Sequence, residues 1–281
     1  MMNAKQEYIR RTKKNKIITN PLTPAKLGIF SIFSFLILLT IIGFFTINSK
    51  GMVINKAIFE ALEGFKNMFF RPKSTRFDLA EGMILVLQTL ALAFITTLVG
   101  SGFALILGLL AAKNITNEKL SNAIKMIISF IRAIPTVLWV LIFAIGAGLG
   151  AVAAVVGMSF HTIGYLVKAY SESFEEIDGG VIEALRASGA NWIQIIFQAI
   201  LPSSATYLLS WTFFRFEINF AVAVAMGAAA GAGGIGFHLF NAAGFYHDIR
   251  EIGVIVYLVL AVALIMELIA IRLKSIYHIH E

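Results

Sequence analysis

The sequence predicts an all-α fold, a polytopic membrane helical bundle with six spans. Two observations carry this prediction. Of the 281 residues, 58% are hydrophobic and only 14% are charged, whereas a soluble domain averages about 45–50% apolar and about 25% charged residues. The chain also contains several uncharged runs of the length, about 20 residues, that one membrane crossing requires. A water-soluble fold of this size could not bury so much apolar surface, so we expect the bundle to face lipid.

The first predicted span covers residues 27–47 and follows a basic tail, residues 1–26. The apolar run is longer than the core of a signal peptide, and no small-x-small cleavage site follows it, so we expect an uncleaved helix. Residues 48–81 mix charged and apolar side chains. Apolar residues recur there at helical spacing from Ile54 to Phe65, which predicts an interfacial helix in an extracytoplasmic segment.

The other five predicted spans follow from uncharged runs and from the glycines and prolines that interrupt them. Gly146, Gly148 and Gly150 offer a turn between the third and the fourth span. The five spans are expected at residues 82–112, 126–148 with a kink at Pro135, 151–167, 203–226 and 252–271.

The distribution of basic residues orients this bundle. Lys and Arg lie mostly in the N-terminal tail, in residues 113–132 and 168–202, and at the C-terminal end. The positive-inside rule then predicts a multi-pass protein of the plasma membrane with both termini cytoplasmic, including a tail at residues 275–281. Because the basic residues flank the spans, the net charge of +7 gives no reason to expect a nucleic-acid partner.

The predicted cytoplasmic loop at residues 168–202 carries the most informative local pattern. A helix of about two turns is expected over residues 181–188, and Gly189 is well placed to end it in the left-handed conformation. Asn191 then caps a second helix, with Gln194 three residues later in a capping-box arrangement.

The first of these loop helices is too short to be stable alone, and its apolar side chains allow two interpretations. They form a connector packed on the protein's own bundle, or a small apolar knob with a charged rim that fits a groove of a partner. The sequence leaves both open. Pro202 is expected to close the second helix where the chain re-enters the membrane.

Three pieces of the loop occur in a recognisable spacing, namely Glu183-Ala184-Leu185, then Gly189, then Ile200-Leu201-Pro202. This pattern resembles the EAA loop of type I ABC importer permeases. Two positions depart from it, with Leu185 where a third small residue is usual and Ala199 where an isoleucine is usual. The resemblance implies a partner groove that accepts the bulkier Leu185. The ATPase-coupling residues that it implies are Glu183, Ala184, Leu185, Arg186, Gly189 and Pro202.

Further motifs extend the resemblance over about residues 82–274. They lie at residues 110–114, 132–135, 174–178, 183–190, 215–219 and 231–236, in that order. Together they are similar to the permease subunits of phosphonate-type ABC importers.

This resemblance implies a permease core at residues 82–274 with a coupling loop at residues 172–202. It implies the translocation of phosphonate or a related phosphorus oxyanion, delivered by an extracytoplasmic binding protein and driven by a cytoplasmic ATPase. The ATPases of this class work in pairs and the chain has one docking loop, so a permease homodimer is expected. The chain itself is expected to be no enzyme and to hold no cofactor, because it carries no Walker A motif and a partner would use the ATP.

Polar residues inside the fifth predicted span are the candidate substrate pathway, namely Arg215, Glu217 and Asn219. Intramembrane charges are costly and usually face a cavity or a partner. Arg215 and Glu217 are two residues apart on a helix and do not pair with each other. Either both form structural ion pairs with other helices or a second subunit, or Arg215 lines the route of an oxyanion. The planar guanidinium of arginine can bind two oxygens of such an anion.

Other polar residues within the spans receive structural interpretations. Arg132 is expected at the membrane interface, His161 in packing and Glu267 in an interface pairing. The phosphonate branch has a basic residue shortly after the fifth-span motif, whereas Phe220 and Ala221 are apolar here. This departure allows a different substrate.

Residues 231–236 match the G-x-G-x-x-G dinucleotide fingerprint, which requires a preceding strand. Here the stretch follows an apolar span, so we interpret its small residues as a site of close helix approach that also lets the chain bend at the outer mouth.

Competing functions come from three classes. The first alternative is a permease of the same class for methionine or another amino acid. An ion-coupled transporter or a channel should show repeated halves with membrane-embedded acids, and no such repeat is visible. A membrane enzyme needs a clustered catalytic or metal-ligating constellation, and none is visible in the sequence.

Overall fold

The computed structural model describes residues 10–11, 17–18, 23–46 and 53–276. The chain divides into two compact units, Met1–Glu60 and Ala61–Glu281, and each is described by itself.

The first unit contains the predicted first span as a helix, α1 (Pro24–Thr46), which is apolar around its whole circumference. Before it, two short strands pair antiparallel, β1 (Arg10–Arg11) with β2 (Ile17–Ile18). This pair within the basic tail is the one departure from the predicted all-α class among the described residues. A further helix, α2 (Ile54–Phe70), begins in this unit and continues into the second. It confirms a helix where the apolar spacing predicted one.

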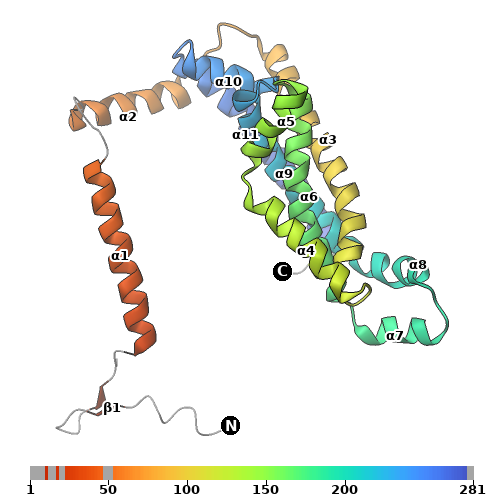
Figure 1. The fold of residues 1–281 in the computed structure, drawn as a ribbon. Helices are drawn as coiled ribbons and strands as arrows, with labels where there is room; N and C mark the ends of the chain where they lie inside the picture. The colour runs from red at the N-terminus through yellow and green to blue at the C-terminus, as the bar shows by residue number, and fades with distance from the viewer. Residues whose placement is uncertain (1–9, 12–16, 19–22, 47–52, 277–281) are drawn as a thin grey trace. The chain divides into compact units, whose positions relative to one another are not determined.

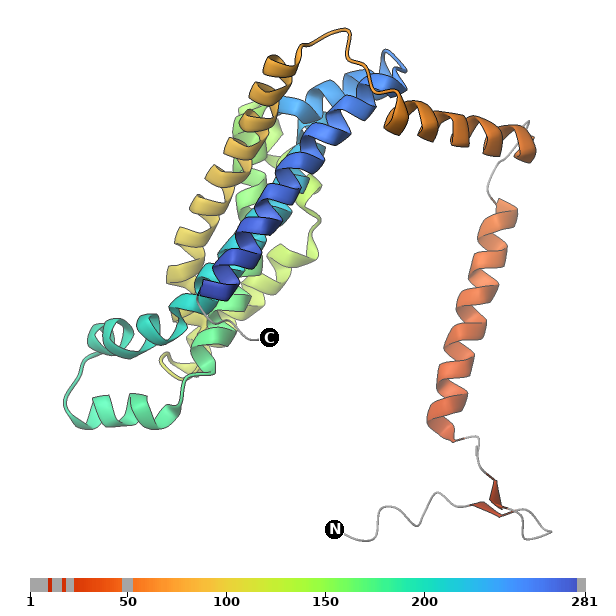
Figure 2. The same ribbon diagram turned by 180° about the vertical axis from the view of Figure 1, so that it is seen from behind.

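The second unit is a helical bundle around three long helices (Figure 1). These are α3 (Leu79–Ala111), α6 (Ala151–Glu175) and α9 (Leu201–Ala229). Close approach of α3 to α6 depends on Gly100, because a Cβ there would lie 2.4 Å from Cγ2 of Thr162. The last helix, α11 (Ile249–Ile276), lies on the opposite side of the bundle from α4 and α5, as the reversed view in Figure 2 shows.

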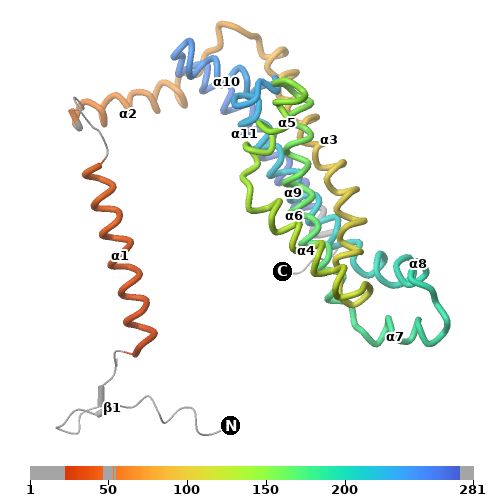
Figure 3. Tube along the Cα trace, in the orientation of Figure 1, coloured from red at the N-terminus to blue at the C-terminus, as the bar shows by residue number. Residues whose placement is uncertain are grey.

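The predicted third span is wrong in its start and in its shape. Instead of one kinked helix there are two, α4 (Glu118–Ala133) and α5 (Thr136–Ala147), bent by 89° relative to each other (Figure 3). Pro135 disfavours a helical conformation of the preceding Ile134, which is extended with φ −89° and ψ 123°. Within the described residues, five helices are long and apolar enough to cross a membrane, or six if this bent pair counts as one span.

Two predicted boundaries near the loop also change. The helix of the fourth span continues eight residues past Val167. Its charged residues Lys168 and Glu172 form an i,i+4 ion pair (3.6 Å), which stabilises the helical conformation there. The fifth begins early, because α8 (Trp192–Ile195), the π-helical η1 (Ile196–Ile200) and α9 run on without a break over Trp192–Ala229.

Pro202 therefore does not close a separate helix. It lies at the start of α9 but inside the continuous helical run, where its ring removes one N–H from the hydrogen-bond ladder. The wider π turn directly before it accommodates the changed ladder.

Three short helices mark the ends of the bundle. The helices α7 (Gly179–Ala187) and α8 project from one end, which we name the loop end (Figure 1). At the opposite, far end lies α10 (Gly234–Gly244), which the sequence did not predict.

Buried residues of the second unit form two apolar clusters with a polar layer between them. The far-end cluster includes Val86, Met158 and Phe220, and the loop-end cluster includes Leu109, Leu166 and Ile195. The polar layer consists of buried side chains that lie between these positions on α3, α6 and α9, namely Thr96, Thr97, Ser159, Thr162, Arg215 and Asn219. This layering places a polar centre deep inside a membrane bundle.

Candidate functional site

The α7–α8 loop is closed by backbone caps at both of its turns. Asp178 accepts a hydrogen bond from the N–H of Gly180 (2.9 Å) at the start of α7. At the end of α7 the N–H of Gly189 donates to the carbonyl of Arg186 (3.0 Å) and that of Ala190 to the carbonyl of Leu185 (3.0 Å). This is a Schellman motif, and it requires the left-handed conformation of Gly189, whose φ is +87°.

The start of α8 is capped as the sequence predicted. The side chain of Asn191 accepts from the N–H of Gln194 (3.0 Å), and the side chain of Gln194 accepts from the N–H of Asn191 (2.7 Å). Both predicted turn signals of the loop are therefore confirmed as geometry.

Both loop helices are attached to the same turn of the bundle, the one that follows α3. Arg186 on α7 donates to the carbonyl of Asn114 (3.1 Å), and the indole of Trp192 on α8 donates to the carbonyl of Ile115 (3.1 Å). The loop is thus held at two points, one on each helix.

That turn is held in place by the end of α6. Glu175 accepts from the backbone N–H of Lys113 (2.7 Å) and forms an ion pair with Lys125 of α4 (2.7 Å). Asn114 donates to the carbonyl of Phe174 (2.7 Å). Glu175 stands in the motif at residues 174–178, but no role was predicted for it or for Lys125. Glu175 ends α6 and Lys125 lies in the middle of α4, and two isolated charges 50 residues apart do not specify a pair.

The side chains of α7 point in two directions. Ile182, only 2% exposed, and the partly buried Leu185 pack in the loop-end cluster. Val181, Glu183 and Ala184 are exposed. The inner face of the helix is thus a connector packed on the bundle, and its outer face is exposed. Docking of a partner on that exposed face stays a prediction. Leu185 is partly buried against its own bundle, which accounts for its bulk without a partner groove.

In the polar layer, Asn219 connects the three central helices. Its amide nitrogen donates to the hydroxyls of Thr97 on α3 (2.9 Å) and Thr162 on α6 (3.0 Å). The Thr162 hydroxyl also donates within its own helix to the carbonyl of Met158 (2.9 Å). These contacts satisfy buried polar groups that would otherwise be costly inside the bundle.

Arg215 lies in the same layer and is 2% exposed. Its Nε donates to the hydroxyl of Thr162 (3.3 Å), a terminal nitrogen lies 2.9 Å from Nδ1 of His161, and its guanidinium lies 5.3 Å from the centre of the Tyr165 ring. Arg215 thus makes hydrogen bonds but no ion pair within the described residues, so the ion pair with another helix of this chain is not found there. A pair with a second subunit and a contact with an oxyanion both stay predictions.

The structure brings together only two of the three candidate pathway residues. Arg215 and Asn219 both contact Thr162. Glu217 is partly exposed, and the described part of the chain gives it no ion pair. Thr162 itself was missed, since a threonine on an apolar helix carries no sequence signal of a buried contact.

The glycine-rich stretch at residues 231–236 joins two helices, α9 and α10, rather than a strand and a helix. A Cβ at Gly236 would lie 1.9 Å from the carbonyl oxygen of Val224. This close backbone approach confirms the interpretation of the stretch as small residues that allow packing.

A charged cluster at the far end was not predicted. Arg76 donates to Glu251 (2.8 Å) and Asp248 (3.2 Å), and its guanidinium lies 3.8 Å from the centre of the Tyr246 ring. The hydrogen bond to Glu251 is the main reason why the pKa of Arg76 is raised. Burial alone would raise the pKa of Asp248, but hydrogen bonds from the backbone N–H groups of Glu251 and Arg250 and from Arg76 together lower it. The partners are more than 170 residues apart in the sequence, so local patterns do not indicate the pairing.

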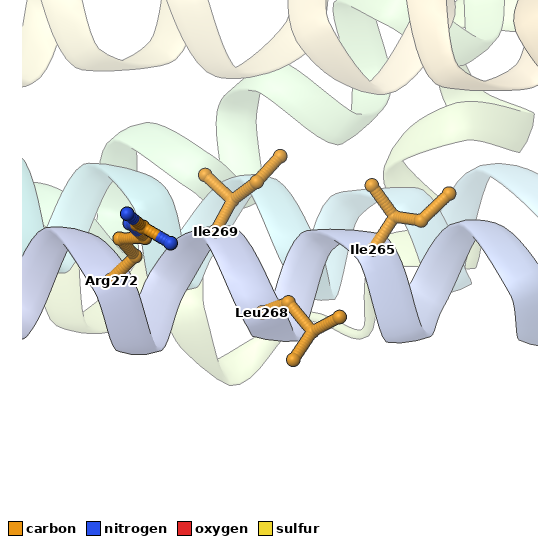
Figure 4. A pocket seen from close by; sticks show the side chains of 4 residues that line it. All are labelled: Ile265, Leu268, Ile269 and Arg272. Carbon is orange, nitrogen blue, oxygen red and sulfur yellow. The ribbon is translucent and has the colours of Figure 1, made fainter.

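The grooves on the bundle surface are apolar. Figure 4 shows one along α11, lined by Ile265, Leu268, Ile269 and Arg272. A second lies between the loop end of α3 and the α8–η1 segment, and Leu109, Trp192 and Phe197 are among its lining residues. The first groove holds one basic group, Arg272, among apolar side chains, and the described lining of the second includes no charged residue.

Comparison with known proteins agrees with this geometry. The chain is 32% identical over 155 residues to the phosphate-import permease protein PhnE of Mycolicibacterium smegmatis, covering 55% of this chain and 29% of that protein. It is 28% identical over 183 residues to the phosphite transport system permease protein PtxC of Stutzerimonas stutzeri, covering 65% and 66%. The chain thus aligns with less than two thirds of each of these relatives. They confirm the resemblance to phosphonate-type permeases that the motifs predicted.

Among solved structures, the inward-facing MetNI methionine ABC transporter has a chain similar to this one, with a TM-score of 0.63 and 24% identity. The match covers 70% of this chain and 95% of that chain. It confirms the predicted type I ABC importer permease fold.

Residues 104–281 match a protein family that is described as the inner membrane component of binding-protein-dependent transport systems. That match contains the α7–α8 loop, the central α6 and α9 helices and most of the polar layer. The chain belongs to this family of membrane transport components.

Proposed function

We propose that this protein is the permease subunit of an ATP-driven importer that translocates phosphonate or a related phosphorus oxyanion. The observation that carries the proposal is the α7–α8 loop, whose backbone is fully capped while one face of α7 stays exposed. The phosphate-import and phosphite relatives support the substrate class.

A cytoplasmic ATPase is the partner that we assign to the exposed face. Glu183 and Ala184 would contact it directly, with the carboxylate of Glu183 open to a basic partner group. Leu185 and Arg186 would hold α7 to the bundle, and Gly189 would set the angle between the two loop helices. ATP would be bound and hydrolysed in the partner, with no catalytic group and no cofactor in this chain.

The proposal places the loop end in the cytoplasm and the protein in the plasma membrane. The basic residues at both ends of the chain support cytoplasmic termini by the positive-inside rule. The far end, with α10 and the Arg76 cluster, then meets the binding protein that delivers the substrate.

Coupling would use the uninterrupted helix from Trp192 to Ala229. Closure of two ATPases would move the loop ends of two permease copies together. Helical backbone continues from α8 through η1 into α9, and the ribbon turns where α8 leaves the bundle (Figure 1). The motion would therefore pass through that bend to Pro202 and then to Arg215 and Asn219. ATP binding supplies the differential free energy between the two states through the partner. The substrate would pass between the two copies.

A methionine or amino-acid permease is the second candidate, because the bundle has the fold of a chain of the methionine transporter. Because that likeness is 24% identical, it shows the fold alone. The two candidates share the coupling loop and differ in the substrate.

One experiment tests the loop. The full chain is co-expressed with its ATPase, and co-purification and uptake are measured for Glu183→Lys and for Glu176→Lys. Both carboxylates are exposed near the loop, but only Glu183 lies on the proposed contact face. We expect Glu183→Lys to reduce association at least about tenfold, as reversal of an interface charge does, and Glu176→Lys to leave it unchanged. Equal association for wild type and Glu183→Lys would overturn the docking proposal.

A second experiment tests the substrate. Uptake of radiolabelled phosphite, phosphate, methylphosphonate and methionine is measured in cells that carry the complete transporter. Uptake of a phosphorus oxyanion without uptake of methionine supports the proposal, and the reverse result supports the second candidate.

A further inference from the structure

One face of α6 carries a line of polar side chains. His161, Tyr165, Lys168 and Glu172 follow one another at spacings of three or four residues, which places them on the same side of the helix. His161 and Tyr165 are partly exposed, and the side chains of Lys168 and Glu172 are 52% and 57% exposed. We name these four residues the α6 stripe. It runs from the polar layer toward the loop end.

Two neighbouring helices add basic groups to this stripe. Arg132, at the end of α4, lies against α6, because a Cβ on Gly164 would be 2.9 Å from its Cγ. Arg215 of α9 reaches His161 from the other side.

The two arginines differ in what their guanidinium groups can do. Arg215 is 2% exposed and its head contacts Thr162, His161 and Tyr165. Arg132 is exposed and makes no ion pair within the described residues. Only Arg132 is free to bind a ligand.

An exposed arginine beside a polar stripe is not suited to a lipid-facing surface. Charges in membrane spans face the bundle interior or a water-filled cavity as a rule. Exposed neighbours away from the stripe, such as Phe130 on α4 and Val156 on α6, are apolar as lipid requires. Arg132 lies at the C-terminal end of α4, where the helix dipole stabilises a positive charge. This position does not explain the four polar residues beside it.

We propose that the α6 stripe is a water-filled, electropositive wall of the translocation route, and that Arg132 is the residue on it that contacts the oxyanion. The inference rests on the proposed function. Arg215 is then a positioning residue, which fixes His161 and Tyr165 and does not meet the substrate. The ligand class is a small tetrahedral oxyanion, whose paired oxygens match the planar fork of a guanidinium.

The first test measures water access, and it needs no knowledge of the substrate. The chain contains no cysteine, so single-cysteine variants of the full chain can be labelled in membrane vesicles together with the ATPase. Tyr165→Cys and His161→Cys report on the stripe, and Phe130→Cys is the matched exposed control. The reagents are membrane-impermeant methanethiosulfonates, one anionic and one cationic.

We expect both stripe variants to react at least about tenfold faster than Phe130→Cys, because thiosulfonates react with the thiolate, which forms in water and not in lipid. If neither reacts faster than the control, the stripe faces lipid or packed protein, and the proposal is wrong. Two reporters guard against the failure of one variant to fold.

The second test measures the charge of the wall. At Tyr165→Cys the anionic reagent should react faster than the cationic one, relative to the same ratio for a free thiol. Adding Arg132→Gln should reduce that preference several-fold, because an exposed positive charge beside Gly164, the neighbour of Tyr165, is removed. Adding Lys125→Gln, which removes a basic residue paired with Glu175, should leave it unchanged. An unchanged preference in Arg132→Gln would remove Arg132 from the wall.

The third test uses transport. For phosphite uptake, Arg132→Gln should raise KM at least about tenfold and Arg132→Lys should restore part of the loss, since one charge-assisted contact is worth about that factor. An unchanged KM in Arg132→Gln, with phosphite transported, overturns the contact with the oxyanion. If phosphorus oxyanions are not transported at all, the proposed function fails, while the labelling rates still decide whether the stripe is a water-filled wall.

Discussion

The polar layer and the α7–α8 loop differ in whether their polar side chains find hydrogen-bond partners within the chain. In the layer, Asn219, Thr162 and Arg215 find their partners within the chain, and among its hydroxyls only that of Thr96 is buried without one in the described residues. In the loop, caps satisfy the backbone while Glu183 stays exposed and unpaired in the described part of the chain. The layer therefore stabilises the bundle, whereas the loop is complete only with a partner. Substitutions in the two regions should separate stability from association.

The largest expected effect on stability is that of Asn219→Leu. It keeps most of the side-chain volume and removes the hydrogen bonds to Thr97 and Thr162. Hydrogen bonds between membrane helices are worth about 0.6 to 1.7 kcal/mol each, so we expect a loss of about 1–3 kcal/mol. The measurement is the unfolding transition of the detergent-purified full chain.

Thr97→Val is the matched control for this prediction, because it removes only one of the two bonds and should cost about half as much. Association with the ATPase should stay at the wild-type level in both variants. If Asn219→Leu unfolds like the wild type but loses uptake, Asn219 belongs to the substrate pathway and not to the structural layer.

In the loop, Gly189→Ala should show the reverse pattern. A residue with a Cβ at a φ of +87° costs about 1–2 kcal/mol in the left-handed region. The bundle does not depend on this turn, so we expect little change in its unfolding. Association with the ATPase should fall about tenfold, the factor that corresponds to 1.4 kcal/mol, as measured by co-purification at several ATPase concentrations.

Gly189→Asn tests whether the backbone conformation is the cause. Asparagine tolerates the left-handed region better than alanine does, so it should recover most of the lost association. Equal losses of association in both variants would mean that the volume of the added side chain, and not the backbone φ, weakens association at this position.

The same contrast explains how much of the molecule the sequence predicts. The spans and the loop turns follow from local rules, which is why Gly189 and the Asn191–Gln194 cap were found. The size of the bend at Pro135 was underestimated, because a proline in the sequence indicates a break in a helix but not the angle between the two parts. The extension of α6 past Lys168 was missed because hydropathy treats a charged i,i+4 pair as a boundary.

Contacts between distant segments lay outside such rules. The sequence marked Arg215 as costly, but only the fold shows that His161 and Thr162 surround it. Likewise, the direction in which Leu185 points is decided by the cluster beneath α7. A pattern of residue types identifies a polar position within a span, and the packing decides whether that position is structural or exposed to a ligand.

A smaller effect is expected for Trp192→Phe, which removes the indole hydrogen bond to the carbonyl of Ile115. One such bond contributes about 0.5–1.5 kcal/mol. Because it attaches α8 to the bundle, amide hydrogen exchange in the loop should become faster while the central helices keep their protection.

Trp139→Phe is the control for that measurement. It removes an equivalent bond, from the Trp139 indole to the carbonyl of Ile131 (3.1 Å), at a distance from the loop. Faster loop exchange in both variants would show that the attachment at Ile115 is not what orders the loop.

The smallest expected effect concerns the far end, where charges are paired in contact with water. The pKa of Asp248 is lowered from its ordinary value of 3.8, so its ionised form is favoured in the folded state. The resulting stabilisation is fully present above about pH 4, and it is lost as the pH falls through the lowered folded pKa. Asp248→Asn should therefore reduce stability slightly at neutral pH and should weaken its decline in acid.

Unfolding of the full chain measured between pH 7 and pH 3 checks this prediction. Asp78→Asn is the control, because Asp78 caps α3 without an ion pair in the described residues. If Asp248→Asn and the wild type lose stability in parallel throughout that range, the Arg76–Asp248 pair contributes nothing, and the closer pair of Arg76 with the buried Glu251 (2.8 Å) is the part of the cluster left to stabilise this end.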